Sequence, residues 1–278
     1  MCRLLLGLVP VLIVVPHLIP LPDKPVPDDK DRSDVSDFKD DGKSLPNRAQ
    51  MDVLAKNDPI AFFKFCLRRQ EREVSSYSLT LQKQERISGK LEKKEIIEVH
   101  FKEKPHSVFF LWKEGQRLAR KALYVEGENN GMLVVKPAGI GGFLKSVERD
   151  PEGKDARSSG RYTLKEFGLQ LGLRHTLGTW EKAKQQKALH VEYLGKQKIK
   201  ELGGRECYVF KRTRYKEPEG DGVTEQTAYV DAETWLLTGS ILKGGEGQLI
   251  AEYYFRDIRL NPKFKEGQFT RQAIENRD

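Results

Sequence analysis

Alternating apolar and polar residues predict strands over most of the chain. In 77–81 and 97–101 every second residue is apolar, which is typical of a sheet with one face in water. The run Val108–Trp112 is apolar throughout, so both of its faces should be covered. Consecutive strands joined by short turns favour an antiparallel meander. Further strands are expected at 122–126, 132–136, 189–199, 205–214, 223–231, 235–243 and 248–259.

A first helix is predicted over 59–74. Asp58 suits the N-cap position and Pro59 suits the first helical residue, where its missing N–H costs nothing. Apolar side chains then recur at helical spacing and include Phe62 and Phe65. A face this aromatic should pack against a sheet.

A second helix is predicted over 164–180. Thr163 and Glu166 have the spacing of a capping box at its start. Phe167 and Leu171 continue an apolar stripe, and both should be buried against the sheet. The pattern as a whole indicates an α+β protein with an open, antiparallel, strongly curved sheet wrapped around two or three helices.

The first 22 residues are typical of an export signal. Arg3 precedes the apolar run Leu4–Val15, whose length suits a signal peptide better than a membrane span. No small-residue cleavage site follows, so residues 1–22 are either a cleaved signal peptide or an N-terminal anchor that stays in the inner membrane. In both cases the protein is expected to be exported.

The rest of the chain divides into three parts. Proline and charged residues dominate 23–48, which predicts a flexible linker. Residues 49–270 should form one domain, of a size consistent with a single β-rich core. Residues 271–278 are expected to be a C-terminal tail.

The chain carries a formal net charge of +8, and residues 49–278 carry about +9, because the linker is net −2 and the first 22 residues carry +1. A basic domain suits anionic partners such as a membrane surface, although a dispersed, solvated charge is the favoured explanation. We expect no nucleic-acid partner, because the chain has neither an arginine-rich tract nor a recognisable nucleic-acid module.

No sequence motif for catalysis is found. The chain lacks a nucleophile elbow, a phosphate loop, an HExxH motif and a dinucleotide fingerprint, and its five histidines are scattered. We therefore expect no catalytic residue, no metal and no cofactor. Cys66 and Cys207 have apolar neighbours, which favours buried free thiols over a disulfide.

Three segments, in this order, carry a resemblance to a known family. They are KEKPHSVFFLWKEGQ at 102–116, YVDAETWLLTGSILKGGEGQL at 229–249 and EYYFRDIRLNPKFKEGQF at 252–269. Together they resemble the LolA/LolB type of periplasmic lipoprotein carrier. Over about 50–270 the chain is still more similar to a bacterial domain-of-unknown-function family, number fifteen seventy-one. The resemblance implies a half-barrel sheet and a periplasmic location.

Aromatic residues on the expected strands suggest an apolar cavity on the concave face of such a sheet. On the strand 108–112, alternate residues should face this cavity, whereas Phe109 and Leu111 should point the opposite way. Arg86 and Arg120 are candidates for the cavity mouth, and no functional residue of the carriers is transferred to this chain. The cavity candidates are Tyr77, Phe101, Val108, Phe110, Trp112, Tyr253 and Phe255.

Two functions fit these observations. The first is a non-enzymatic, monomeric binding protein of the cell envelope, whose partner is a lipid, another amphiphile with an acyl chain, or a lipidated protein. The alternative is a structural or interaction protein of the envelope whose half-barrel is filled by its own side chains. An enzyme is the less favoured third possibility.

Overall fold

The computed structural model describes residues 40–139, 145–220 and 222–276. The chain divides into two units, Met1–Phe38 and Lys39–Asp278, and the described residues all belong to the second. The expected leader and most of the expected linker lie outside the described residues. Within these ranges, no helix combines the length and the apolar character needed to cross a membrane.

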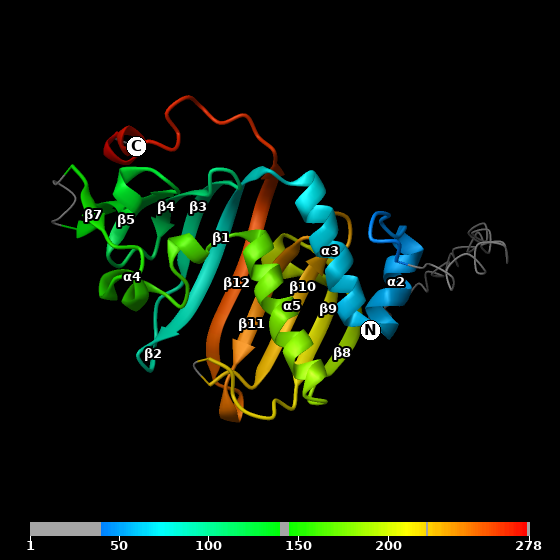
Figure 1. Cartoon of the computed structure of the whole chain (residues 1–278). Coiled ribbons are helices and arrows are strands. Elements are labelled where there is room, and N and C mark those ends of the chain that lie inside the picture. The colour runs from blue at the N-terminus through cyan, green and yellow to red at the C-terminus, as the bar shows by residue number, and fades with distance from the viewer. Residues whose placement is uncertain (1–39, 140–144, 221, 277–278) are drawn as a thin grey trace, which may run out of the picture. The chain divides into compact units, whose positions relative to one another are not determined.

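Twelve strands form one curved sheet, and their order is β7-β6-β5-β4-β3-β1-β12-β11-β10-β9-β8, with β2 paired to β1 (Figure 1). The strand pairings among the described residues are all antiparallel, so the expected sheet is confirmed. The strands are β1 (Ser76–Ile87), β2 (Lys90–Leu91), β3 (Glu95–Lys102), β4 (Ser107–Glu114), β5 (Ala119–Val125), β6 (Leu133–Pro137), β7 (Val147–Arg149), β8 (His190–Ile199), β9 (Arg205–Thr213), β10 (Glu225–Asp231), β11 (Leu237–Lys243) and β12 (Leu249–Leu260).

The sheet consists of two meanders that meet at the centre. The strands from β1 to β7 form one, and those from β8 to β12 form the other. They join where β1 pairs with β12, with Leu81 opposite Phe255 and Lys83 opposite Tyr253. The last long strand of the chain is therefore required to hold the two halves of the sheet together.

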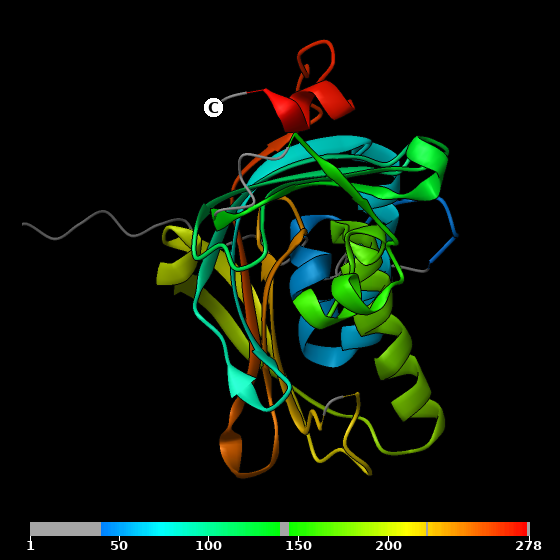
Figure 2. The ribbon, with the colours of Figure 1, turned by 90° about the vertical axis from the view of Figure 1, so that its left-hand side faces the viewer.

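Two long helices occupy the concave face, and the sheet curves around them (Figure 2). In the first of them Asp58 caps the helix by accepting the N–H of Ala61 at 3.1 Å, and Pro59 is the first residue, as expected. Phe62 and Phe65 are buried. The helices are α2 (Arg48–Asn57), α3 (Pro59–Glu73), α4 (Lys154–Ser159), α5 (Leu169–Gln185) and α6 (Arg271–Glu275).

The second long helix, α5, starts later than the sequence predicts. Glu166 accepts the N–H of Thr163 at 2.8 Å, but this pair closes a short 3₁₀ turn. An extended Phe167 follows, and α5 begins only at Leu169. The buried stripe of α5 begins at Leu169 and does not include Leu171. The expectation that Leu171 is buried is therefore wrong, since its side chain is 39% exposed.

The buried stripe of α5 joins α3 to the sheet. It consists of Leu169, Leu173, Leu177, Trp180 and Ala183, which follow helical spacing. Its largest member, Trp180, packs 4.7 Å from the ring of Phe63 in α3. The indole N–H of Trp180 donates to Gln226 on β10 at 2.9 Å, which satisfies a polar atom inside the core.

The outer face of β4, β5 and β6 is also covered. Phe109 packs there with the completely buried Ile274 of α6, and Leu111 and Phe269 join the same cluster. Phe110, by contrast, belongs to the concave core. This confirms that alternate residues of β4 face opposite ways, and it explains why Val108–Trp112 is apolar throughout.

Two further expectations concern single residues. Cys66 and Cys207 are both buried free thiols, and burial raises the pKa of Cys66 well above its usual value. The expected strand from residue 235 begins only at Leu237. Trp235 belongs to the preceding turn, where its φ of 59° is in the left-handed region and its ring lies beneath Arg69.

Candidate functional site: a cavity on the concave face

A cavity of about 860 Å³ lies between the concave face of the sheet and the segment that runs from residue 161 into α5. We call it the concave cavity. Its sheet wall consists of large apolar side chains, because the alternating positions of several strands face inwards here. This wall includes Leu81 of β1, Phe110 of β4, Leu242 of β11, and Tyr253 and Phe255 of β12.

Phe167 forms much of the opposite wall. Its ring centroid lies 4.9 Å from that of Phe110 and 6.4 Å from that of Phe255. Leu164 and Leu171 add to this apolar wall. The concave cavity is thus bounded by aromatic rings from three separate parts of the chain.

One face of α5 borders the cavity, and it differs from the stripe that packs against α3. Its members are small, polar or exposed, and include Gly172, His175, Thr179 and Lys182. Tyr162 stands beside this face, with its ring 5.8 Å from His175 and 6.3 Å from Tyr253. Tyr162 is 41% exposed, so it lies where the cavity meets the solvent.

A buried charge cluster is built into the sheet wall. The ammonium of Lys83 lies 2.8 Å from Glu85 and 3.0 Å from Glu95, and these three side chains are only 6–13% exposed. The hydroxyl of Tyr253 donates to Glu85 at 2.7 Å, and the indole of Trp112 donates to Glu95 at 3.1 Å. We call these five residues the Lys83 cluster.

The electrostatics of this cluster favour the charged form of Lys83. Burial alone would lower the pKa of Lys83, but Glu85 and Glu95 outweigh it, and the pKa of Lys83 is raised. Burial, together with Glu85, raises the pKa of Tyr253 well above its usual value, so Tyr253 stays protonated and donates. Lys83 and Glu85 line the concave cavity and provide its sheet wall with a charged patch.

A second ion pair beside the cavity joins the buried Arg212 of β9 to Glu219, whose side chain is 38% exposed. Arg212 is 2% exposed and contacts Glu219 through two hydrogen bonds of 3.1 and 2.7 Å. Its guanidinium also lies 3.9 Å from the ring centre of Tyr215. Glu219 and Tyr215 both line the concave cavity. In the described part of the chain no three His, Cys, Asp or Glu residues come together as metal ligands.

The structure brings some of the expected cavity residues together and places others elsewhere. Phe110, Tyr253 and Phe255 line the concave cavity. Tyr77, Phe101 and Val108 are completely buried in the adjacent core. The rings of Tyr77 and Phe101 stack there with their centroids 4.5 Å apart.

The other candidates have different surroundings. Trp112 belongs to the Lys83 cluster rather than to the cavity lining. Arg86 donates to the carbonyls of Leu249 and Gly89 at the end of β1, and neither Arg86 nor Arg120 lines the cavity.

Sequence reasoning missed the Lys83 cluster, although the signal was present. Lys83 and Glu85 continue the inward-facing series that begins with Tyr77 on β1. Glu95 opens the inward-facing series of β3 in the same way. The alternation of inward-facing and outward-facing residues along β1 and β3 therefore predicts that these charged residues face the concave side. Their charge, taken alone, suggests a position in solvent.

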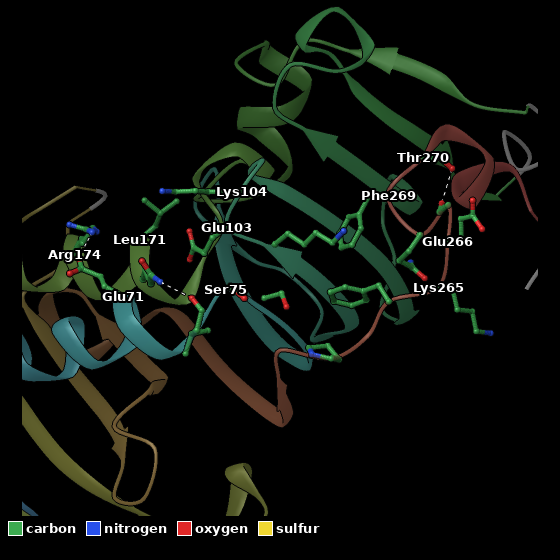
Figure 3. A pocket seen from close by; sticks show the side chains of 18 residues that line it. Glu71, Ser75, Glu103, Lys104, Leu171, Arg174, Lys265, Glu266, Phe269 and Thr270 are labelled. Carbon is green, nitrogen blue, oxygen red and sulfur yellow. Dashed lines mark hydrogen bonds and ion pairs between the residues drawn. The ribbon is translucent and has the colours of Figure 1, made fainter.

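A second hollow, of about 1100 Å³, lies outside the concave cavity (Figure 3). It is bordered by the ends of α3 and α5, the β3–β4 turn and the segment 262–270, and its lining is mostly polar. Glu71 and Arg174 form an ion pair on one side. Leu171 lines both hollows and is the partition between them.

Comparison with known proteins identifies a family for most of the described domain. The model of a family described as protein of unknown function (DUF1571) matches residues 74–276. No curated protein matches the chain.

Solved structures provide weaker likenesses. The chain is similar to the Pseudomonas aeruginosa MucA/MucB complex at 16% identity and a TM-score of 0.44, covering 78% of this chain and 62% of that one, which is less than two thirds. It is similar to the lipoprotein LppX of Mycobacterium tuberculosis at 10% identity and a TM-score of 0.42, covering 75% and 99%. A LolA superfamily protein from Nitrosomonas europaea matches at 9% identity and a TM-score of 0.31, covering 76% and 98%. Likenesses this low do not bear on what this chain binds.

Proposed function

Because the chain belongs to the DUF1571 family, for which no function is known, we propose a function from its own cavity. The protein is a non-enzymatic binding protein of the cell envelope. It holds the apolar chain of a lipid or of a lipidated protein in the concave cavity. The observation that carries this proposal is the aromatic wall of the cavity. Phe110, Phe167 and Phe255 form it around a volume of about 860 Å³.

The size and lining of the cavity agree with this proposal. Ligand pockets of proteins have volumes of about 300–1,000 Å³ and are mostly apolar with a few polar groups. In the concave cavity the sheet wall contributes Lys83, Glu85 and the hydroxyl of Tyr253, and the polar face of α5 borders the opening. An acyl chain that buries ten CH₂ groups gains about 8 kcal/mol before the cost of association, which is compatible with micromolar affinity.

The envelope location rests on the sequence. Arg3 and the apolar run Leu4–Val15 are typical of an export signal. We propose the periplasm as the compartment, with the leader either cleaved or retained as an anchor. A tagged full-length chain that remained in the cytoplasm would contradict this part of the proposal.

One observation favours the alternative function, an interaction protein with a filled half-barrel. Tyr77, Phe101 and Val108 pack so closely that none of them is exposed. Most of the concave face beside the cavity is thus already filled by the chain's own side chains. The two functions differ in whether a ligand occupies the remaining space.

Native mass spectrometry of the purified protein, followed by titration with the fluorescent fatty acid cis-parinaric acid, distinguishes the two functions. We expect either a co-purifying lipid or saturable binding of the probe at micromolar concentration. The absence of both, in a sample whose melting curve shows a folded protein, would favour the filled interaction protein.

A further inference from the structure

We propose that one end of the sheet is a docking surface for an anionic lipid bilayer. The surface consists of two neighbouring hairpin tips. Residues 86–94 run from the end of β1 through β2 to the start of β3, and residues 113–120 run from the end of β4 into the start of β5. We call it the basic tip; its first hairpin carries β2 in Figure 1. It is separate from the concave cavity, since none of its residues lines that cavity. The proposal does not rest on the function proposed above.

The two hairpins form one continuous surface. Gly115 lies directly against the backbone of Lys94, where a Cβ on Gly115 would collide with the Lys94 carbonyl oxygen. Arg117 of the second hairpin lies 3.9 Å from Glu92 of the first. The exposed charges of both hairpins therefore act on the same partner.

Positive charge is concentrated on the basic tip. Its 17 residues hold seven Lys or Arg and two Glu, a net charge of +5, whereas the whole chain carries +8. Two acids outside the tip offset part of this charge, because Glu252 pairs with Lys94 and Glu98 pairs with Lys113. When both are included, the tip still carries +3. Lys93 is exposed and forms no ion pair with any described residue.

An apolar side chain projects from the same surface. Leu118 is 58% exposed, the highest value among the large hydrophobic side chains of the described residues. Its carbonyl accepts the N–H of Ala138 at 3.0 Å, which holds the backbone of this tip against the end of β6. The basic tip thus presents positive charges together with one exposed apolar side chain, on a backbone that is held in place by a hydrogen bond.

This combination fits an anionic membrane better than other anionic partners. Basic residues near a bilayer of anionic lipids each strengthen binding by roughly fivefold at moderate salt. A leucine at the tip of a loop can enter the interface between headgroups and acyl chains, where burial of its side chain adds to the attraction. A nucleic acid or an acidic polysaccharide would interact with the charges but would leave Leu118 exposed to water.

Vesicle sedimentation of the full-length protein tests the proposal. One arm contains phosphatidylcholine vesicles, and the other contains vesicles with 30% phosphatidylglycerol, both at 50 and 300 mM salt. The test variant is L118S/K90Q/K93Q. The matched control is L194S/K198Q/K200Q, which removes one exposed leucine and two exposed lysines at β8 and the turn that follows it. Any contribution of the N-terminal leader is the same in all variants.

We expect the wild type and the control to prefer the anionic vesicles by at least tenfold at 50 mM salt, and less at 300 mM because of screening. The test variant should lose most of this preference and keep its melting temperature. Equal loss in test and control variants would overturn the proposal. So would a test variant that keeps its preference for anionic vesicles but loses binding to a single-stranded DNA probe.

The single variant L118S separates the two contributions. It keeps every charge, so a loss of at least threefold in binding to anionic vesicles supports membrane insertion. An unchanged affinity would mean that the tip recognises charge alone, which contradicts a bilayer as its specific partner.

Discussion

The side-chain oxygen of Asn261 accepts hydrogen bonds from the backbone N–H of Ser75 at 2.9 Å and from its hydroxyl at 3.0 Å. The side-chain N–H₂ of Asn261 donates to the carbonyl of Glu73 at 2.7 Å. Asn261 therefore ties the end of β12 to the last residue of α3, Glu73, which is 188 residues away in the sequence. Its φ of 49° places it in the left-handed region, which asparagine tolerates better than most residues.

We expect the substitution Asn261→Ala to lower the free energy of unfolding by about 2 kcal/mol. It removes four hydrogen bonds, the fourth of which comes from the N–H of Ser76 at 3.2 Å, and it strains the backbone. Asn261→Gly should cost less, since glycine adopts this φ without strain. Urea denaturation measures both values. Equal losses in the two variants would show that the backbone conformation contributes nothing.

The substitution Phe65→Ala should cost about 3–5 kcal/mol, because Phe65 of α3 is only 2% exposed. Leu171→Ala on α5 is the control, and its cost should stay below about 0.5 kcal/mol because Leu171 is 39% exposed. Both are compared by urea denaturation with the wild type. A loss under 1 kcal/mol for Phe65→Ala would contradict the packing of α3 described above.

The strands and the first helix were predictable because each has a local signal. The alternation at 77–81 and 97–101 specifies which side chains face inwards, and Asp58-Pro59 specifies where α3 begins. The start of α5 was not predictable from its capping box. The box closes a 3₁₀ turn here, and an extended Phe167 follows. The ring of Phe167 packs against those of Phe101 and Phe110, which are both far from Phe167 in the sequence.

The candidate site was predictable only in part, and for a related reason. The position of α5 relative to the sheet decides which inward-facing rings border the cavity. The sequence of the strands alone does not predict this position. Phe110 and Phe101 both face inwards, yet Phe110 lines the cavity and Phe101 is completely buried. Two polar residues of the segments that resemble the carriers, Asp231 and Asn261, have structural roles. Asn261 fixes β12 to α3, and Asp231 organises a turn.

Asp231 gives a pH-dependent prediction. Its buried carboxylate accepts two hydrogen bonds from Arg205, at 2.5 and 2.9 Å, and one from the N–H of Thr234 at 2.8 Å. Burial acts to raise the pKa of Asp231, but the hydrogen bonds from Arg205 and Thr234 outweigh it and lower the pKa. The stabilisation is therefore complete above the unfolded pKa, near 4, and is lost as the pH falls through the folded value.

We expect Asp231→Asn to cost about 2 kcal/mol at pH 7, since Arg205 is partly exposed and its charge is screened. The difference in unfolding free energy between wild type and variant should shrink below about pH 4. Denaturation curves at pH 7, 5 and 3 measure it. A difference that is the same at all three values would show that the ionised carboxylate is not what stabilises the turn.

The Lys83 cluster should respond more strongly to the loss of one member than to the loss of all its charges. Lys83→Met leaves Glu85 and Glu95 buried without a counter-ion, which should cost about 3–5 kcal/mol. The variant K83M/E85Q/E95Q has no buried charge, and its glutamines can still accept from Tyr253 and Trp112. It should recover most of that loss in thermal denaturation. A triple variant as unstable as Lys83→Met would mean that ion pairing is not what holds this part of the wall.

A variant that fills the concave cavity without disturbing the core provides the sharpest test of ligand binding. Val108 is unsuitable, because it is completely buried and a larger residue there would test folding instead. Gly172 of α5 lines the cavity, and a Cβ added to it would meet no atom within 4 Å. Gly178 on the same helix has the same free space but does not line the cavity.

We therefore expect Gly172→Phe to weaken binding of cis-parinaric acid at least tenfold, because the ring occupies space that the acyl chain needs. Gly178→Phe should bind like the wild type. Replacing glycine by phenylalanine inside a helix gains roughly 0.3–0.5 kcal/mol of helix propensity, so neither variant should lose stability. Weakened binding with an unchanged melting temperature in Gly172→Phe alone would place the acyl chain beside α5. Equal binding by both variants would place the probe elsewhere on the protein and leave the concave cavity without a ligand.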